Sequence, residues 1–157
     1  METKKLTKKD FNDHNEFIGD ESILSFNGNL EIEESLGCVK FKWLNIKGYI
    51  LAKAFSGIEA GSGIKAGWGI EAGSGIEAGL YITCKLTISS KLRIFAGLCI
   101  WKIPKEEDKT IICGKLASGT IKYGILNEVG LPEKKETCDG KIVEIEGKKY
   151  QLKEQEK

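Results

Sequence analysis

Isoleucine recurs at every sixth residue through the centre of the chain. The positions are Ile58, Ile64, Ile70, Ile76, Ile82, Ile88, Ile94 and Ile100. The repeat is most regular in units of the type Gly-Ile-Glu-Ala-Gly-Ser, which begin at Gly57, Gly63, Gly69 and Gly75. A fixed short period of this kind indicates that the chain folds as a stack of similar units.

The residues between the isoleucines alternate between apolar and polar. A small residue stands two places after each isoleucine, at Ala60, Ala66, Ala72, Ala78, Cys84, Ser90 and Ala96. A third row stands four places after, at Ser62, Trp68, Ser74, Leu80, Leu86, Leu92 and Leu98. A period of two is typical of a β-strand, whose successive side chains point to opposite faces. We therefore expect all three rows to face the interior, with Trp68 in the core or at a corner.

The two periods together predict the fold. One strand cannot run the length of the repeat, because strands usually contain about 5–6 residues. A turn in every hexad gives a three-sided coil of about 18 residues per rung, with glycines at corners where a positive φ is cheap. We predict an all-β fold, a short parallel β-helix-like solenoid with an N-terminal strand cap and a C-terminal β-hairpin. A meander of hairpins and, for residues 57–79, a flexible glycine-rich linker stay open as alternatives.

The same stacking predicts which charged side chains oppose each other. Lys53 is expected beside Glu71, which is favourable, and Glu59 beside Glu77, which is mildly unfavourable. Glu59, Glu71 and Glu77 also form a row of carboxylates of the kind that acid–base or metal chemistry uses. Solubility is the simpler interpretation of that row.

The flanks divide the chain into three segments of one domain. Residues 1–22 are polar and are expected to form an arm or a short helix. Residues 23–131 hold alternating strands that cap the repeat, followed by the repeat itself. Residues 132–157 are expected to form a hairpin, with its turn at Glu146 and Gly147, and a frayed tail.

Composition argues against several classes of function. Lys and Arg number 24 against 23 Asp and Glu, so the overall charge favours neither nucleic acid nor membrane as a partner. No apolar stretch is long enough to span a bilayer, and the charged start is unlike a secretory signal. Five scattered cysteines and a single histidine, His14, fit reduced thiols in a cytoplasm. We therefore expect no catalytic residue, no metal and no cofactor.

Aromatic residues provide the candidate binding site. The alternation predicts that Phe95 and Trp101 point outward, where exposed aromatic side chains serve as interface anchors. Lys102 and Lys105, with the acidic residues that follow, would form a polar rim. The alternative is that a cap or residues 104–110 cover the two aromatic rings.

The Ile-x-Ala-Gly-x-Gly units of residues 44–103 resemble those of the bactofilins, a family of bacterial cytoskeletal proteins. The resemblance implies a right-handed β-helix of about three hexads per rung that assembles into a homo-oligomeric scaffold. Hexapeptide acyltransferases share the six-residue period, but they place glycine directly after the aliphatic residue and use a catalytic histidine. This chain has Glu59, Lys65 and Glu71 in that place, so we reject an acyltransferase.

The whole chain, including residues 113–116 and 123–132, is also similar to small proteins of bacteriophages and mobile elements. That resemblance implies inhibition of a host defence nuclease of the CRISPR type by occupation of a protein surface. We therefore predict a non-enzymatic protein-binding module whose partner is a protein, such as a bacterial nuclease complex. A self-assembling bactofilin-like scaffold is the alternative.

Overall fold

The computed structural model describes residues 1–132, 142–145 and 148–151. The last two of these ranges are an antiparallel strand pair, β16 (Ile142–Ile145) and β17 (Lys148–Gln151). The turn predicted at Glu146 and Gly147, and the predicted frayed tail, lie outside the described residues.

Strands dominate the rest of the chain, so the predicted all-β class is confirmed. They are β1 (Thr3–Leu6), β2 (Ser25–Phe26), β3 (Asn29–Ile32), β4 (Gly37–Phe41), β5 (Leu44–Ile46), β6 (Ile50–Ala54), β7 (Ser56–Ala60), β8 (Ile64–Ala66), β9 (Ile70–Gly73), β10 (Ile76–Ala78), β11 (Ile82–Thr83), β12 (Thr87–Ala96), β13 (Thr110–Cys113), β14 (Lys115–Tyr123) and β15 (Ile125–Glu128). Three 3-10 turns join them in the described part: η1 (Lys8–Asp10), η2 (Glu21–Leu24) and η3 (Glu107–Lys109).

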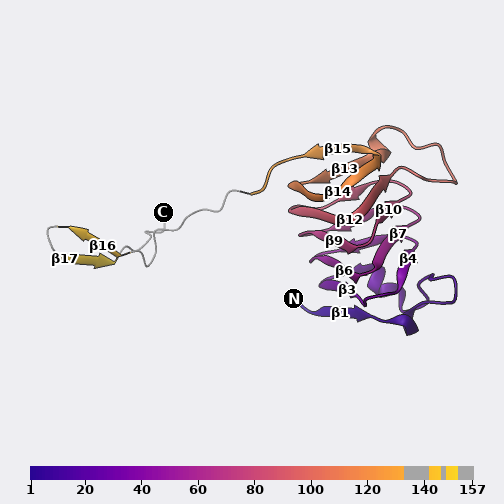
Figure 1. Cartoon of the computed structure of the whole chain (residues 1–157), viewed down its shortest axis with the longest axis horizontal. Helices are drawn as coiled ribbons and strands as arrows, with labels where there is room; N and C mark the ends of the chain where they lie inside the picture. The colour runs from indigo at the N-terminus through magenta and orange to yellow at the C-terminus, as the bar shows by residue number, and fades with distance from the viewer. Residues whose placement is uncertain (133–141, 146–147, 152–157) are drawn as a thin grey trace.

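The strands pair in parallel and form two curled sheets (Figure 1). One sheet has the order β1-β3-β6-β9-β12-β10-β7-β4, with β14 also on β12; the other has the order β15-β13-β11-β8-β5-β2. The long β12 carries the first sheet around a corner, because its first part pairs with β9 and its last part with β10. The hairpin meander is therefore wrong for the repeat, and residues 57–79 form strands rather than a linker.

The pairing register follows the repeat. Ile58 pairs with Ile76, and Ile64 with Ile82, so the chain returns above its starting point after eighteen residues. The number of residues between paired positions is larger before the repeat, where Leu44 pairs with Ile64. It is largest where Ile82 pairs with Ile111, because residues 97–109 loop out of the stack between these two strands.

Two of the three predicted rows line the core. The isoleucines from Ile58 to Ile94 and the small residues two places after them are buried. The third row is mostly outside the core: Trp68, Leu92 and Leu98 are exposed, although Leu80 is buried. The expectation that this row faces inward is wrong for these exposed residues. Most of the short strands end before the row, so the alternation of a strand no longer applies there. Leu92 lies within β12, where the pairing with β14 is irregular between Ser89 and Arg93.

One of the two predicted charge pairings is present. Glu59 lies opposite Glu77 on β7 and β10. Lys53 does not lie opposite Glu71, because the longer step places Leu51 there and the register is irregular between Ala52 and Ala54. Instead, Nζ of Lys53 lies 3.9 Å from a carboxylate oxygen of Glu31.

The glycines of the repeat have a different role from the one predicted. Glycines with positive φ in the described part are Gly37, Gly97, Gly119, Gly124 and Gly130, which all lie outside the hexads that begin at 57, 63, 69 and 75. Within the repeat, a Cβ on Gly67 would collide with the carbonyl oxygen of Lys47, and one on Gly79 with that of Gly61. These glycines are needed because backbone segments after neighbouring strands approach each other closely there.

The N-terminal segment differs from the polar arm or short helix that was expected. Its first residues form β1, which extends the sheet beyond β3 and buries Leu6 completely. The rings of Phe11 and Phe17 then pack on Phe41 of β4, with the Phe11 and Phe41 centroids 5.8 Å apart. Most charged side chains of this segment are exposed, while β1 pairs with β3 and becomes the edge strand of the sheet at this end.

Candidate functional site

The most prominent surface feature is the loop of residues 97–109, which joins β12 to β13 and projects from the stack (Figure 1). It leaves the strand at Gly97, whose φ is +92° and whose Cα approaches Lys109 so closely that a Cβ would lie 2.5 Å from its side chain. The two ends of the loop are therefore held together at its base. A closed base lets the loop extend without disturbing the strands below it.

The tip of this loop carries large apolar side chains in solvent. Ile100 is 99% exposed, Ile103 is 94% exposed and Trp101 between them is 63% exposed. Scattered apolar residues are common on protein surfaces, but clustered large ones mark interaction sites. We call Ile100, Trp101 and Ile103 the apolar tip.

Polar contacts hold the loop behind the apolar tip. Lys102 donates to Asp108 with its Nζ 2.9 Å from Oδ2, and the backbone N–H of Lys105 donates to the same oxygen at 3.1 Å. The bond from Lys102, followed by the bond from Lys105, lowers the pKa of the Asp108 carboxyl. The Nζ of Lys102 also lies 5.7 Å from the Trp101 ring centroid. Asp108 thus connects both lysines that were predicted to frame the aromatic ring.

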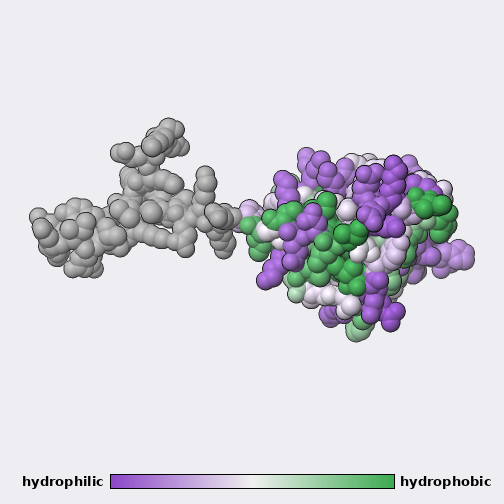
Figure 2. Space-filling view, turned by 90° about the horizontal axis from the view of Figure 1, so that it is seen from above, coloured by the Kyte–Doolittle hydropathy of each residue, from purple (hydrophilic) through white to green (hydrophobic). Residues whose placement is uncertain are grey.

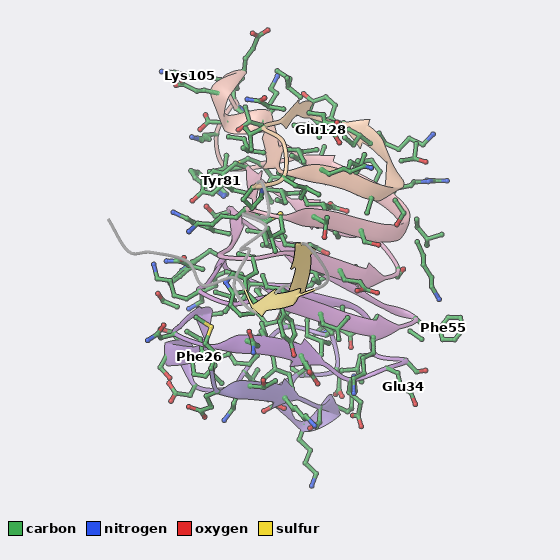
Figure 3. All side chains as sticks on the ribbon, turned by 90° about the vertical axis from the view of Figure 1, so that its left-hand side faces the viewer. Phe26, Glu34, Phe55, Tyr81, Lys105 and Glu128 are labelled. Carbon is green, nitrogen blue, oxygen red and sulfur yellow. The ribbon has the colours of Figure 1, made fainter. Side chains whose placement is uncertain are left out.

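The structure places three of the four predicted site residues together. Trp101, Lys102 and Lys105 share the loop, and Lys105 extends from one end of the molecule (Figure 3). Trp101 is not covered by residues 104–110, which was the alternative. Phe95 instead lies half-buried on β12, opposite Glu77 of β10 and Tyr123 of β14.

Sequence reasoning missed the isoleucines of the apolar tip. Ile100 was counted as the last inward-facing member of the repeat, yet it is almost fully exposed. The strand β12 has already ended before Gly97. The six-residue period of isoleucine therefore continues in the sequence beyond the last strand that it predicts. In the sequence, Gly97 before Ile100 and Pro104 after Ile103 were the available signals that the strand ends.

Phe95 lines a groove of about 490 Å³ together with Glu77 and the cations of Lys91, Arg93 and Lys122. Burial and, next, the charge of Glu59 raise the pKa of the Glu77 carboxyl, while Lys40 acts in the opposite direction. Glu71 does not belong to this row, because it lies on β9 opposite Leu51. The predicted row of three carboxylates is therefore reduced to a pair.

Three thiols, those of Cys38, Cys84 and Cys113, are held in their protonated form. Desolvation, reinforced by Glu59 and Glu77, raises the pKa of Cys38 to about 11 even though solvent reaches the residue. Burial raises the pKa of Cys84 to about 12, and it also raises the pKa of Cys113. A protonated thiol is a poor nucleophile and a poor metal ligand.

Within the described ranges, no three or more His, Cys, Asp or Glu side chains form a group that could hold a metal ion. No helix in the same residues has the length and apolar character to cross a membrane. No protein-family model, no curated protein and no solved structure matches this chain.

Proposed function

We propose that this chain is a non-enzymatic protein-binding module that inserts the loop of residues 97–109 into a partner. The observation that carries the proposal is the exposure of Ile100 and Ile103, at 99% and 94%, on either side of Trp101. Three large apolar side chains kept in water forgo the burial that each would gain in a core, about 1.5–3 kcal/mol per side chain. Burial in a partner's pocket recovers that free energy, and aromatic anchors of this kind dominate many interfaces.

The rest of the fold supports this role as a rigid base. The parallel pairing and the eighteen-residue register support a short β-helix-like solenoid, in which the loop interrupts one rung. Because Asp108 ties Lys102 and Lys105 behind the apolar tip, the loop loses less conformational entropy when it binds.

The class of partner follows from the resemblance to small phage proteins. We propose a bacterial defence nuclease complex of the CRISPR type, inhibited in the cytoplasm because the loop occupies a surface that the nuclease needs. The partner surface is expected to be an apolar pocket wide enough for an indole ring. Its rim is expected to be polar, to match Lys105 and the neighbouring acidic residues.

The test is inhibition of DNA cleavage by a panel of purified RNA-guided nuclease complexes. The full chain is expected to inhibit at least one of them, and the double variant Ile100→Ser/Ile103→Ser to lose inhibition. Phe55→Ser is the matched control, because Phe55 is also exposed but lies far from the loop (Figure 3). Equal loss in the control, or full inhibition by the loop variant, would remove the loop as the binding site.

Self-assembly is the second candidate, and the end of the stack favours it. In the described residues β14 pairs only with β12 and β15 only with β13, so both have a free edge. Tyr123, Ile125, Leu126 and Val129 are exposed there. Figure 2 looks onto this end and shows apolar side chains gathered over it. Open strand edges with apolar side chains are sites of association.

The two ends of the stack are unequal, and this limits the assembly that we propose. At the opposite end β1 also has a free edge in the described residues, but Lys4 and Lys5 are exposed on it, and Phe11 and Phe17 are packed on Phe41. A filament of head-to-tail copies needs two ends that attract each other, whereas a two-fold pair needs one. Light scattering is therefore expected to find a dimer that Leu126→Glu dissociates and Leu92→Glu leaves intact. Long filaments would instead favour the bactofilin-like scaffold.

A further inference from the structure

A second groove gathers positive charge at the corner between the two sheets. Lys47, Lys65 and Lys85 line it together with Trp68, and its volume is about 480 Å³. Lys65 points outward from the middle of β8, Lys47 follows directly after β5, and Lys85 lies two residues after the end of β11. These strands are stacked in the order β5-β8-β11, so the three lysines come from three successive rungs.

The charge of this groove is not neutralised within the described part of the chain. No Asp or Glu is among its lining residues, and none of the ion pairs there involves Lys47, Lys65 or Lys85. The chain as a whole has a net charge of only +1. Three unpaired lysines on one surface are therefore a local feature, which the overall charge conceals.

Trp68 presents an aromatic surface beside these lysines. Its side chain is 48% exposed. Its backbone is fixed in the corner, because its N–H donates to the carbonyl of Gly48 at 3.1 Å and its carbonyl accepts from the N–H of Leu86 at 2.7 Å. The side-chain amides of Asn27 and Asn45 complete the polar lining. A fixed, half-exposed indole ring offers a stacking platform rather than core packing.

We propose that this groove binds single-stranded nucleic acid. Lysines bind phosphate as point charges, whereas paired recognition of carboxylates favours arginine, which is absent from the lining. The register sets Lys47 and Lys85 on either side of Gly67, with Lys65 offset by two residues along β8. Adjacent strands lie about 4.8 Å apart, so the cations are spread over three strands, which suits successive phosphates better than one isolated anion. Stacking of a base on Trp68 is tolerant of sequence, as is usual for such sites. The site is separate from the loop and does not depend on the function proposed for it.

The test is fluorescence anisotropy of labelled oligothymidylate and oligouridylate, each about 12 nucleotides long, titrated with the full chain across a range of KCl concentrations. With three phosphate contacts, log K is expected to fall against log [KCl] with a slope of about −2. Lys65→Gln/Lys85→Gln is expected to weaken binding by about ten-fold or more at low salt and to reduce the slope to about −0.7. Trp68→Ala is expected to weaken binding without changing the slope.

The control variant removes two positive charges from a different groove. Lys91→Gln/Lys122→Gln acts on the groove that contains Phe95 and Glu77, and it is expected to leave oligonucleotide binding unchanged. Thermal unfolding of each variant establishes that the fold is intact. Absence of binding by the unmodified chain at low salt would overturn the proposal, as would an equal loss in the control. Displacement of the oligonucleotide by polyglutamate at equal charge would also overturn it, in favour of an acidic protein surface.

Discussion

Glu59 and Glu77 lie directly opposite each other on the parallel strands β7 and β10. The next residue along the same row is Phe95 of β12, and Lys40 of β4 lies on the other side of Glu59. Glu77 thus has a carboxylate on one side and an aromatic ring on the other. Burial and the charge of Glu59 both raise the pKa of its carboxyl, and Lys40 compensates only in part. A repeated hexad sequence produces this arrangement automatically, because stacking places identical positions together.

Removal of the Glu77 charge is expected to stabilise the protein at neutral pH. A carboxyl whose pKa is raised by folding favours the folded state when protonated and disfavours it when ionised. The Glu77→Gln variant should therefore gain roughly 0.2–1 kcal/mol at pH 7, and the gain should shrink as the pH falls through the raised pKa. Denaturant unfolding at several pH values measures it. Glu71→Gln is the control because Glu71 faces Leu51, and an equal gain there would contradict the explanation.

Gly79→Ala is expected to destabilise the fold more than Gly61→Ala. The two glycines occupy the same position in stacked coils, after β10 and β7. A Cβ on Gly79 would collide with the carbonyl of Gly61, whereas a Cβ on Gly61 would lie 3.6 Å from that of Lys42. We expect a cost of about 1–3 kcal/mol for Gly79→Ala and no significant cost for Gly61→Ala. Chemical denaturation of both variants decides the point, and equal costs would show that the coils have room to separate.

Buried and exposed isoleucines are expected to differ sharply in their contribution to stability. Ile76 is completely buried between Ile58 and Ile94, and its truncation to alanine should cost about 2–5 kcal/mol. Ile103→Ala, in the apolar tip, should change the free energy of unfolding by less than about 0.5 kcal/mol. Urea unfolding of the two variants tests this difference. A large cost at Ile103 would mean that the loop is packed in solution and unsuited to bind a partner.

Alkylation of Cys38 and Cys84 is expected to be slow near neutral pH. The raised pKa values of Cys38, about 11, and Cys84, about 12, leave few thiolates to react. Modification of Cys38 by iodoacetamide, followed by peptide mass spectrometry, should become about ten-fold faster for each pH unit up to about 11. The urea-unfolded chain is the reference, and Cys38 should react in it at the rate of an ordinary thiol. Rapid labelling of the folded chain at pH 7 would contradict the protonated state.

The sequence predicted much of the core and part of the candidate site. Ile58 and Ala60 are buried as expected because a strand places alternate side chains on one face. Trp101 was recognised as exposed by the same alternation, although it lies in a loop where that rule has no force. Ile100 shows where the periodicity fails as a predictor. Its position fits the six-residue period of the buried isoleucines, but its backbone is no longer part of a strand.

The lysine groove lay beyond any argument from local sequence. Lys47, Lys65 and Lys85 are far apart in the chain, and each reads as an ordinary solvent-facing residue of a strand or turn. The pairing of Leu44 with Ile64 and of Ile64 with Ile82 gives steps of twenty and eighteen residues, which align Lys47 with Lys85. Lys65 lies two residues from that line on the strand between them.

The sequence by itself determined that the chain forms short strands with isoleucine and a small residue inside, because side-chain alternation is a local property of an extended backbone. Tertiary structure alone decided where each strand ends, which charges oppose each other and which apolar side chains stay in water. Those outcomes depend on how many residues separate two paired strands, which only the pairing itself sets. Between Ile82 and its partner Ile111 that number is largest, because residues 97–109 loop out and carry the apolar tip.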